Sequence, residues 1–311
     1  LIANNLHNVD VIHSHTWYAN MAGHTASLLY GTPHIVSAHS LEPLRPWKAE
    51  QLGGGYQISS WAEKTSYEAA AAIIAVSDGM RADVLAAYPD VDPKKVVTIR
   101  NGVDTSKFAP NNNPAVLQEF GITGRYAMFV GRITRQKGLA HLLRAWKSVP
   151  AEYGLVLAAG SPDEETVGNE VAALIAELQA TRSNVWWIKE MLPHDKLTAA
   201  LTQADLFLCP SIYEPLGIVN LEAMGCETAV LASRVGGIPE VVSHQETGIL
   251  VDYTADHSRY EADLAAAISE LMADPARLEK YGKAGRLRAQ THFGWDAVAA
   301  QTISLYRSVI S

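Results

Sequence analysis

The sequence is poor in cysteine and in basic residues, and it has no long apolar run. Only Cys209 and Cys226 are present in 311 residues, which excludes a disulfide-built scaffold and favours a reducing cytoplasm. Lys and Arg number 25 against 33 Asp and Glu, a formal net charge of −8. This balance argues against nucleic acid or a membrane surface as partner, because both require a basic face. No apolar run approaches the roughly 18 residues of a membrane span, so we expect a soluble cytoplasmic protein.

Apolar residues, by contrast, are plentiful. The composition is 48% hydrophobic and 19% charged, enough to bury the cores of two domains. Strand-like and helix-like segments alternate throughout, which is typical of α/β proteins with parallel sheets covered by helices on both faces. The predicted strands are 9–15, 34–40, 72–77 and 96–101, followed by 126–132, 154–160, 184–189, 205–211, 228–233 and 248–252.

A turn-rich stretch separates these two series of strands. Its core, Ala-Pro-Asn-Asn-Asn-Pro, forbids a long regular element. We predict a first domain at 1–108, a linker at 109–124, a second domain at 125–292 and a final helical segment at 293–311. The first series has only four strands where a doubly wound domain has about six. Since the chain also begins with Leu1 rather than Met, we expect that a segment in front of it is missing.

Two cations follow the first predicted strand of the second domain. Gly131-Arg132 ends that strand, and Lys137-Gly138 precedes a predicted helix. Two cations between glycines that let a ligand approach the backbone suit a diphosphate, and the helix would add its N-terminal dipole. The alternative is a strand that ends in solvated basic residues.

A second motif pairs two carboxylates across a helix start. In Glu214-Pro-Leu-Gly-Ile-Val-Asn-Leu-Glu222, Pro215 suits a first helical turn and Gly217 leaves backbone N–H groups open to a phosphate. Glu214 would lie in the loop and Glu222 about two turns into the helix. Carboxylates bind vicinal hydroxyls with paired hydrogen bonds, so both could hold sugar diols. An ordinary amphipathic helix with a loop Glu is the alternative.

Histidines mark the ends of two strands in the first domain. His39 ends the second strand, at the edge where open α/β sheets place ligands. It could contact a substrate hydroxyl, or it could be structural. His13, His15 and His24 have no acidic or cysteine ligand near them in sequence, so we predict no metal site. The stretch 47–61 contains Gly53-Gly-Gly and is predicted as a flexible loop flanked by aromatic residues. It could bind the acceptor by stacking rings on sugar faces, or it could be a surface loop anchored by two tryptophans.

Together these motifs resemble those of the retaining glycosyltransferases of family 4. Glu214 to Glu222 resembles the family's E-x7-E motif, and Gly131-Arg132 with Lys137-Gly138 resembles its G-R-x4-K-G pair. Val235 to Glu240 and Asn101 to Asp104 are similar to further signatures. The resemblance implies the GT-B fold, with two Rossmann-like doubly wound domains facing a cleft, an acceptor-binding one first and a nucleotide-sugar-binding one second. The block 38–56 with His13–Trp17 looks like the actinobacterial glycogen synthases, a group that includes maltose-1-phosphate synthases.

The resemblance also implies roles for individual residues. Arg132 and Lys137 would grip the donor diphosphate, Glu214 and His39 would contact the donor sugar, and Glu222 would bind the ribose. Residues implied as catalytic are His39, Arg132, Lys137 and Glu214; those implied to bind the nucleotide sugar are Gly131, Ile188, Met191, Gly217, Ile218, Val219 and Glu222, several through backbone groups. The last helix would cross back onto the first domain, and roughly 70 to 90 residues would be missing in front, on the scale of the absent strands.

The expected activity is a retaining, metal-independent α-glucosyl transfer in glycogen biosynthesis, without a cofactor. The donor would be ADP-glucose or a related nucleotide sugar, and the acceptor an α-1,4-glucan or glucose 1-phosphate. Two alternatives stay open: another hexosyltransferase of this family with a different donor or acceptor, or a non-catalytic nucleotide-sugar-binding module. The oligomeric state is also open, with a homodimer as one possibility.

Overall fold

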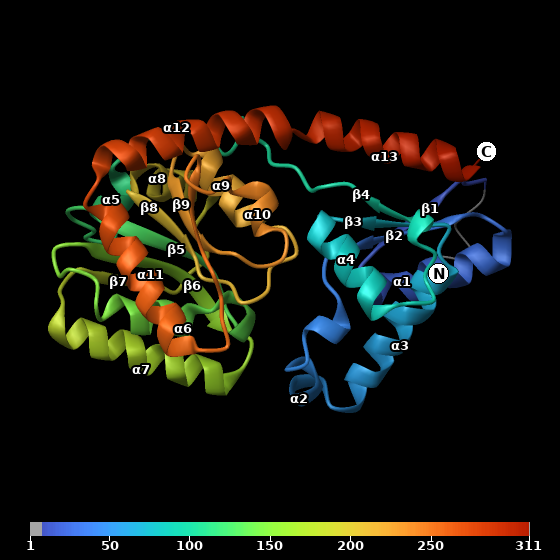
Figure 1. Cartoon of the computed structure of the whole chain (residues 1–311), viewed down its shortest axis with the longest axis horizontal. Coiled ribbons are helices and arrows are strands. Elements are labelled where there is room, and N and C mark those ends of the chain that lie inside the picture. Colours follow the sequence, from blue (N-terminus) through green and yellow to red (C-terminus); the bar gives the residue numbers. More distant parts are fainter. Residues whose placement is uncertain (1–7, 311) are drawn as a thin grey trace. The chain divides into compact units, whose positions relative to one another are not determined.

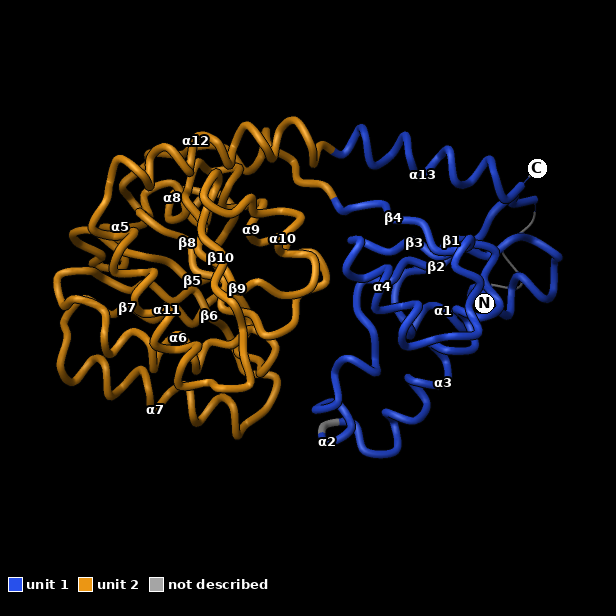
Figure 2. The backbone as a smooth tube through the Cα atoms, in the orientation of Figure 1, with its two compact units in different colours: residues 1–101, 295–311 blue, residues 102–294 orange. Residues whose placement is uncertain are grey.

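The computed structural model describes residues 8–310, apart from the side chain of Gln51. The chain forms two compact units (Figure 2). Unit 1 consists of Leu1–Asn101 and Trp295–Ser311, and unit 2 of Gly102–Gly294. Leu1, in front of which we expect a missing segment, lies outside the described residues.

Unit 1 is built on a four-stranded parallel sheet in the order β1-β2-β3-β4 (Figure 1). The strands are β1 (Ile12–His15), β2 (His34–Ala38), β3 (Ala72–Ala75) and β4 (Val96–Thr98). Its helices are α1 (Trp17–Tyr30), α2 (Lys48–Leu52), α3 (Gly54–Ala69), α4 (Asp78–Ala87) and α13 (Trp295–Ile310), with short 3-10 turns at Glu42–Leu44 and Pro93–Lys95. Val298, Leu305, Tyr306 and Val309 of α13 pack on the sheet core, so the last helix of the chain belongs to unit 1.

Unit 2 is built on a six-stranded parallel sheet in the order β10-β9-β8-β5-β6-β7. The strands are β5 (Tyr126–Ile133), β6 (Gly154–Pro162), β7 (Val185–Ile188), β8 (Leu206–Cys209), β9 (Ala229–Ser233) and β10 (Gly248–Val251). Its helices are α5 (Ala115–Glu119), α6 (Leu139–Trp146), α7 (Glu165–Thr181), α8 (His194–Gln203), α9 (Ile218–Gly225), α10 (Ile238–Val241), α11 (His257–Met272) and α12 (Pro275–His292), with a 3-10 turn at Arg135–Lys137. Helices α6, α7 and α11 pack together, as do α8, α9 and α12, so the sheet is doubly wound.

The predicted fold class and all ten predicted strands are confirmed. The strands are near-continuous apolar runs because helices bury both faces of a parallel sheet. β2, β3, β8 and β9 are buried at every position. Both cysteines are free and buried. Among the described residues, no helix combines the length and the apolar character needed to cross a membrane.

Two segments differ from the sequence-based expectation. The segment expected as a linker, 109–124, lies within unit 2, where the backbone N–H of Asn111 donates to Thr202 Oγ1 over 2.9 Å and α5 packs on α8. The expected loop at 47–61 is wrong, since α2 and α3 occupy most of it. Gly53 ends α2 and starts α3 with φ at 51°, so the glycines there separate two helices. Packing of α3 on α1 then offsets the low helix propensity of Gly54 and Gly55.

The core of unit 2 includes a close approach of α12 to the chain before β9. Gly282 is buried in α12, and a Cβ built on it would lie 2.0 Å from the carbonyl oxygen of Glu227. We expect Gly282→Ala to destabilise unit 2 by about 1–3 kcal/mol, because the backbone must shift to make room. Gly55→Ala is the matched control: its nearest atom would be 3.7 Å away, and helix propensity predicts a gain of up to about 1 kcal/mol. Urea unfolding of both variants tests this; equal stability of Gly282→Ala and the parent chain would contradict the close approach.

Candidate functional site

The strand order of unit 2 brings two loops together at one edge of the sheet. β5 lies between β6 and β8, so the connections leave β5 and β8 toward opposite sides. Such a switch point opens a crevice beyond the carboxyl ends of the strands, which is where α/β sheets bind ligands. Arg132 lies at the end of β5, Lys137 in the turn that follows it, and Glu214 in the loop after β8. The two motifs predicted from sequence are therefore neighbours in space.

Glycines allow the two loops to approach each other. Gly138 has φ at 64°, and a Cβ on it would lie 2.0 Å from the carbonyl oxygen of Pro210. The N–H of Ile212 donates to the carbonyl of Gln136 over 2.9 Å and joins the loops. Behind them, the N–H of Gly237 donates to the carbonyl of Glu214 over 3.0 Å. This contact gives the Val235–Glu240 signature a structural role, since it holds the loop that carries Glu214.

A largely buried ion pair lies at the junction of these loops. Lys137 Nζ donates to Glu214 Oε2 over 2.7 Å, with side-chain exposures of 18% and 10%. Ser211 Oγ donates to the same carboxylate oxygen over 3.2 Å. Burial disfavours the Lys137 ammonium, but the charge of Glu214 and its hydrogen bond outweigh burial and raise the pKa of Lys137. A fixed positive charge is thus present at neutral pH in a chain of net charge −8.

Glu222 and the start of α9 lie beside this pair. The N-cap of α9 is Gly217 with φ at 95°, and no side chain caps the helix, so the N–H groups of Ile218 and Val219 have no side-chain acceptor. Burial raises the pKa of Glu222 to about 7, although the charge of Lys137 acts to lower it. A carboxyl group with this pKa changes charge within the physiological range.

Arg132 lies on the outer side of the same edge. Its guanidinium is exposed and donates to Asp163 over 2.5 Å, so the partner of Arg132 is on the loop after β6. Gly131 and Arg132 line a hollow of about 500 Å³ together with Gly160, Lys189 and Met191. This hollow is predominantly apolar, and the Lys189 ammonium lies 4.2 Å from the centroid of the Trp187 ring. An apolar lining of this kind can hold the flat face of a heterocycle.

Two residues that the resemblance implies as nucleotide-sugar ligands, Ile188 and Met191, differ sharply in exposure. Met191 is 95% exposed at the hollow, whereas Ile188 is 3% exposed at the end of β7. The side chain of Ile188 belongs to the core, so only its backbone is available to a ligand.

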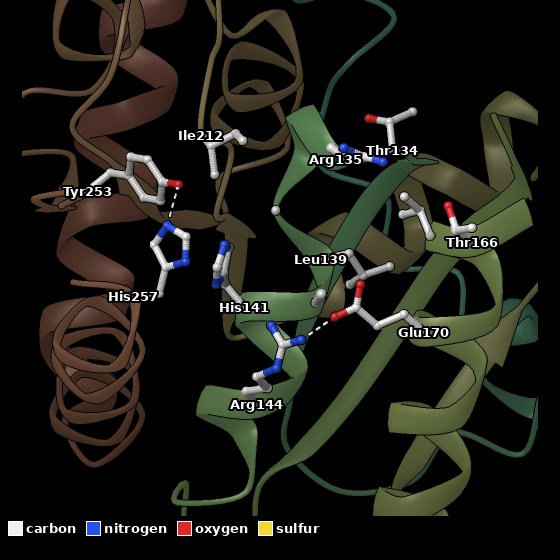
Figure 3. A pocket seen from close by; sticks show the side chains of 13 residues that line it. Thr134, Arg135, Leu139, His141, Arg144, Thr166, Glu170, Ile212, Tyr253 and His257 are labelled. Carbon is white, nitrogen blue, oxygen red and sulfur yellow. Dashed lines mark hydrogen bonds and ion pairs between the residues drawn. The ribbon is translucent and has the colours of Figure 1, made fainter. Parts of the chain in front are cut away.

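A second hollow of about 440 Å³ lies on the α6, α7 and α11 side of unit 2 (Figure 3). Its charged side chains are paired with one another or with neighbours. Arg144 contacts Glu170, and Tyr253 and His257 share a hydrogen bond of 3.1 Å (Figure 3). His141 is bonded to Glu261 over 2.8 Å. Of the residues predicted from sequence only Gly138 lines it, and it offers no free charge to a ligand.

His39 lies in unit 1, where the structure pairs it with a second histidine. His39 Nε2 and His15 Nδ1 share a hydrogen bond of 2.9 Å. Burial, and next the neighbouring His15, lower the pKa of His39 to about 4. Both imidazoles are therefore neutral at pH 7. Within residues 8–310, no three His, Cys, Asp or Glu side chains are grouped as a metal site would require.

Sequence reasoning missed three partners of the predicted residues, namely His15, Asp163 and Ser211. The partnership of His15 with His39 could have been predicted, because β1 and β2 are adjacent parallel strands. His15 is the last residue of β1, and His39 directly follows β2. Asp163 follows β6 and Ser211 follows β8, the strands on either side of β5, but no spacing rule identifies which carboxylate or hydroxyl turns toward a given cation.

Comparison with known proteins agrees with this arrangement. A family model described as "Glycosyl transferases group 1" matches residues 118–288, and one described as "Glycosyltransferase Family 4" matches residues 1–107. An alpha-maltose-1-phosphate synthase of Mycolicibacterium smegmatis is 54% identical over 314 residues, covering 99% of this chain and 81% of that protein. Sucrose-phosphate synthase from Thermosynechococcus elongatus superposes with a TM-score of 0.81 at 28% identity, over 96% of this chain and 73% of its own.

A more distant structure shares the fold. Anabaena HepE, solved with UDP-glucose, has a TM-score of 0.83 at 20% identity and covers 99% of this chain and 81% of its own. The matched residues span both parallel sheets and both motif-bearing loops of unit 2. The chain therefore belongs to the group 1 glycosyl transferases and is a glycosyltransferase with the GT-B fold.

Proposed function

We propose that this chain transfers an α-glucosyl unit from ADP-glucose to glucose 1-phosphate, with retention of configuration, and so forms maltose 1-phosphate. The observation that supports this acceptor is the 54% identity, over 99% of the chain, to an alpha-maltose-1-phosphate synthase. The choice of ADP-glucose as donor rests on the resemblance of residues 38–56 to the actinobacterial glycogen synthases and on the charged site in unit 2. An α-1,4-glucan end is the competing acceptor. Two free, buried cysteines support a reducing cytoplasm as the place of the reaction.

The donor diphosphate would bind where the positive charge of unit 2 is fixed. Lys137 is oriented by Glu214 at 2.7 Å, and the uncapped N-terminus of α9 directs N–H groups to the same edge. Arg132 would add a second cation at the mouth of the 500 Å³ hollow, in which the nucleobase would lie between Gly131 and Met191. Glu222 would accept hydrogen bonds from the ribose diol.

Transfer would proceed on one face of the donor sugar. The bond from the anomeric carbon to the diphosphate oxygen breaks, the acceptor hydroxyl oxygen bonds to that carbon, and the hydroxyl proton passes to the departing diphosphate. Negative charge therefore grows on the leaving group. Lys137, Arg132 and the α9 N–H groups would stabilise it without reorganisation, and Glu214 and His39 would hold the sugar. No resident cofactor is needed for this chemistry.

The proposal is tested by combining two donors with two acceptors. We expect ADP-glucose with glucose 1-phosphate to release ADP and to give a new disaccharide phosphate in ³¹P NMR, with an α linkage in the ¹H coupling constant. UDP-glucose and glycogen should react at least about tenfold more slowly, since a site built for one partner leaves polar groups unpaired with another. Preferred extension of glycogen would assign the glucan as acceptor. ADP binding with no turnover on any acceptor would favour the non-catalytic module.

Loss of the fixed charge should impair turnover far more than folding. Lys137→Met and Glu214→Gln should each lower kcat by about 10²–10³-fold, the cost of removing one preorganised electrostatic contact. Lys147→Met is the matched control, since Lys147 forms an exposed ion pair with Glu177 at 2.8 Å and should keep its rate. Rates are compared at saturating donor, with thermal midpoints recorded for each variant. Unchanged turnover in Lys137→Met would contradict the assigned diphosphate site.

Nucleotide binding should depend on the charge of Glu222. Because burial raises the pKa of Glu222 to about 7, the carboxyl group is protonated below pH 7 in the empty site. If the carboxylate binds the ribose diol, ADP binding must release this proton, and affinity should fall as the pH drops below 7. Calorimetry in buffers of different ionisation enthalpy measures the proton release. Glu222→Gln should bind ADP more weakly and with no such release; an unchanged pH dependence in this variant would assign the proton to another group.

A further inference from the structure

The His15–His39 pair in unit 1 follows directly from the pairing of β1 with β2. The register sets His15 opposite Ser37, and His39 is two residues beyond Ser37 on the same face of the sheet. The rings stack with centroids 5.2 Å apart and planes inclined by 25°. His15 Nδ1 and His39 Nε2 are 2.9 Å apart, so one of the two nitrogens carries the proton between them.

This shared proton couples the tautomers of the two rings. In a neutral imidazole one nitrogen donates and the other accepts. If His39 Nε2–H donates to His15 Nδ1, then His39 Nδ1 keeps a lone pair and His15 Nε2 carries a proton. The reverse arrangement puts a proton on Nδ1 of both rings, which is the less stable tautomer of free histidine. The first arrangement is therefore favoured, and it turns His39 Nδ1 into a hydrogen-bond acceptor. No described residue forms a hydrogen bond to that nitrogen.

The surroundings keep both rings uncharged. Burial is the largest cause lowering the pKa of His39 to about 4 and that of His13 to about 4, and burial also lowers the pKa of His15. The titratable groups nearby are His13 on β1, which bonds Tyr306 of α13 and Ser37 of β2 at 2.6 and 2.8 Å, and His34 on β2, which bonds Ser14 at 2.7 Å. Among the described residues, no carboxylate is hydrogen-bonded to either ring of the pair, so no ion pair with a carboxylate favours the imidazolium form.

Backbone strain occurs directly beside His15. Thr16 has φ at 64° and ψ at 158°, a region that essentially only glycine adopts and that is strained for a β-branched residue. Thr16 Oγ1 donates to the carbonyl of His15 over 2.6 Å, and α1 begins at the next residue. Such strain persists only where the surrounding structure enforces it, and it is concentrated at functional sites. In this chain the strained Thr16 directly follows His15, the residue that is hydrogen-bonded to His39.

We propose that His15 is a positioning residue that holds the proton of His39 on Nε2 and so presents the Nδ1 lone pair of His39 to a hydroxyl group of the bound sugar. This inference rests on the proposed function, in which His39 contacts the sugar. The hydroxyl of the substrate would donate to Nδ1, and His15 itself would not touch the substrate.

Imidazole ¹⁵N NMR on the ligand-free protein tests the tautomer without any assay of activity. In the parent chain we expect His39 Nδ1 to show the shift of an unprotonated nitrogen and Nε2 that of a protonated one. His15→Asn and His15→Asp should keep this state, because an amide or carboxylate oxygen can accept from Nε2–H; His15→Ala should give a mixture. A proton on Nδ1 of His39 in the parent chain would overturn the proposal.

Kinetics then separates positioning from mere structural support. We expect His15→Ala to lower kcat about tenfold with an unchanged Kd for ADP, and His15→Asn to restore most of it. In His15→Asp the new carboxylate should stabilise the His39 imidazolium, so the acidic limb of the pH–rate profile should move up by about one to three pH units. His292→Asn, at an exposed position of unit 2, serves as the control with an unchanged profile.

Two outcomes would count against the inference at different levels. An unmoved acidic limb in His15→Asp, with full rate in His15→Ala, would overturn the role of His15 even if the proposed reaction is confirmed. A fixed Nε2 tautomer combined with full activity in His39→Ala would instead remove His39 from the proposed site, while the pairing itself would stand. Because His15→Asn retains a hydrogen-bonding group, a failure of His15→Ala to fold leaves the test intact.

Discussion

The adjacency of β5 and β8 is the constraint on which the site in unit 2 depends. In a parallel sheet every connection must cross a face, and the loops leaving two neighbouring strands toward opposite faces open a crevice between them. Lys137 and Glu214 are 77 residues apart in sequence, yet they meet at 2.7 Å because these strands are neighbours. Gly138 allows the approach, since any Cβ there would collide with the Pro210 carbonyl. Sheet order, loop glycines and ion pair therefore form a single arrangement.

The Lys137–Glu214 pair fixes a positive charge at the edge of the sheet in unit 2. A protein of net charge −8 repels a diphosphate on average, so attraction must come from a few groups held in place. Desolvation penalises the Lys137 ammonium, and Glu214 compensates for it. The pair thus keeps its charge in a largely water-excluded position, where electrostatic interactions are stronger than in water. Arg132 is exposed, so its charge is solvated and needs no partner to stay ionised. Its electrostatic interactions are screened by water and are therefore weaker than those of Lys137.

Sequence patterns predicted the sheets well and the side-chain partners poorly. Buried parallel strands are apolar along their whole length, so all ten were visible. The turn before Glu222 was also visible, because glycine and proline positions around Glu214 report backbone geometry that only those residues permit. The pairing of Arg132 with Asp163 was not predicted, since rotamers are decided by packing, whereas the pairing of His39 with His15 follows once β1 is placed beside β2. The first turns of α3 were missed because its first two residues, Gly54 and Gly55, have low helix propensity, and only the contacts of α3 with α1 and with the turn at Glu42–Leu44 reveal them.

The segment after His39 is held in place by a buried hydrogen-bond network. Glu42 is fully buried, and its Oε2 accepts from Ser59 Oγ at 2.8 Å, while its backbone N–H donates to Glu63 at 2.9 Å. Burial, as the largest cause, raises the pKa of Glu63 to about 7. Two carboxyl groups in one buried network cannot both ionise cheaply, so a proton on Glu63 relieves their repulsion.

Arg45 and Lys48 then neutralise Glu42 from the rim. The hydrogen bonds of this network fix the turn at Glu42–Leu44 against α3, only three residues beyond His39.

Both units contain polar groups that are removed from water and paired with a specific partner. A polar group is desolvated at a stability cost, and a partner is supplied that fixes its position: Glu214 for Lys137, His15 for His39, and Glu63 for the Glu42 backbone. Because a buried polar group without its partner costs more than the pair contributes, each partner enforces one geometry, and that enforcement is what a preorganised site requires.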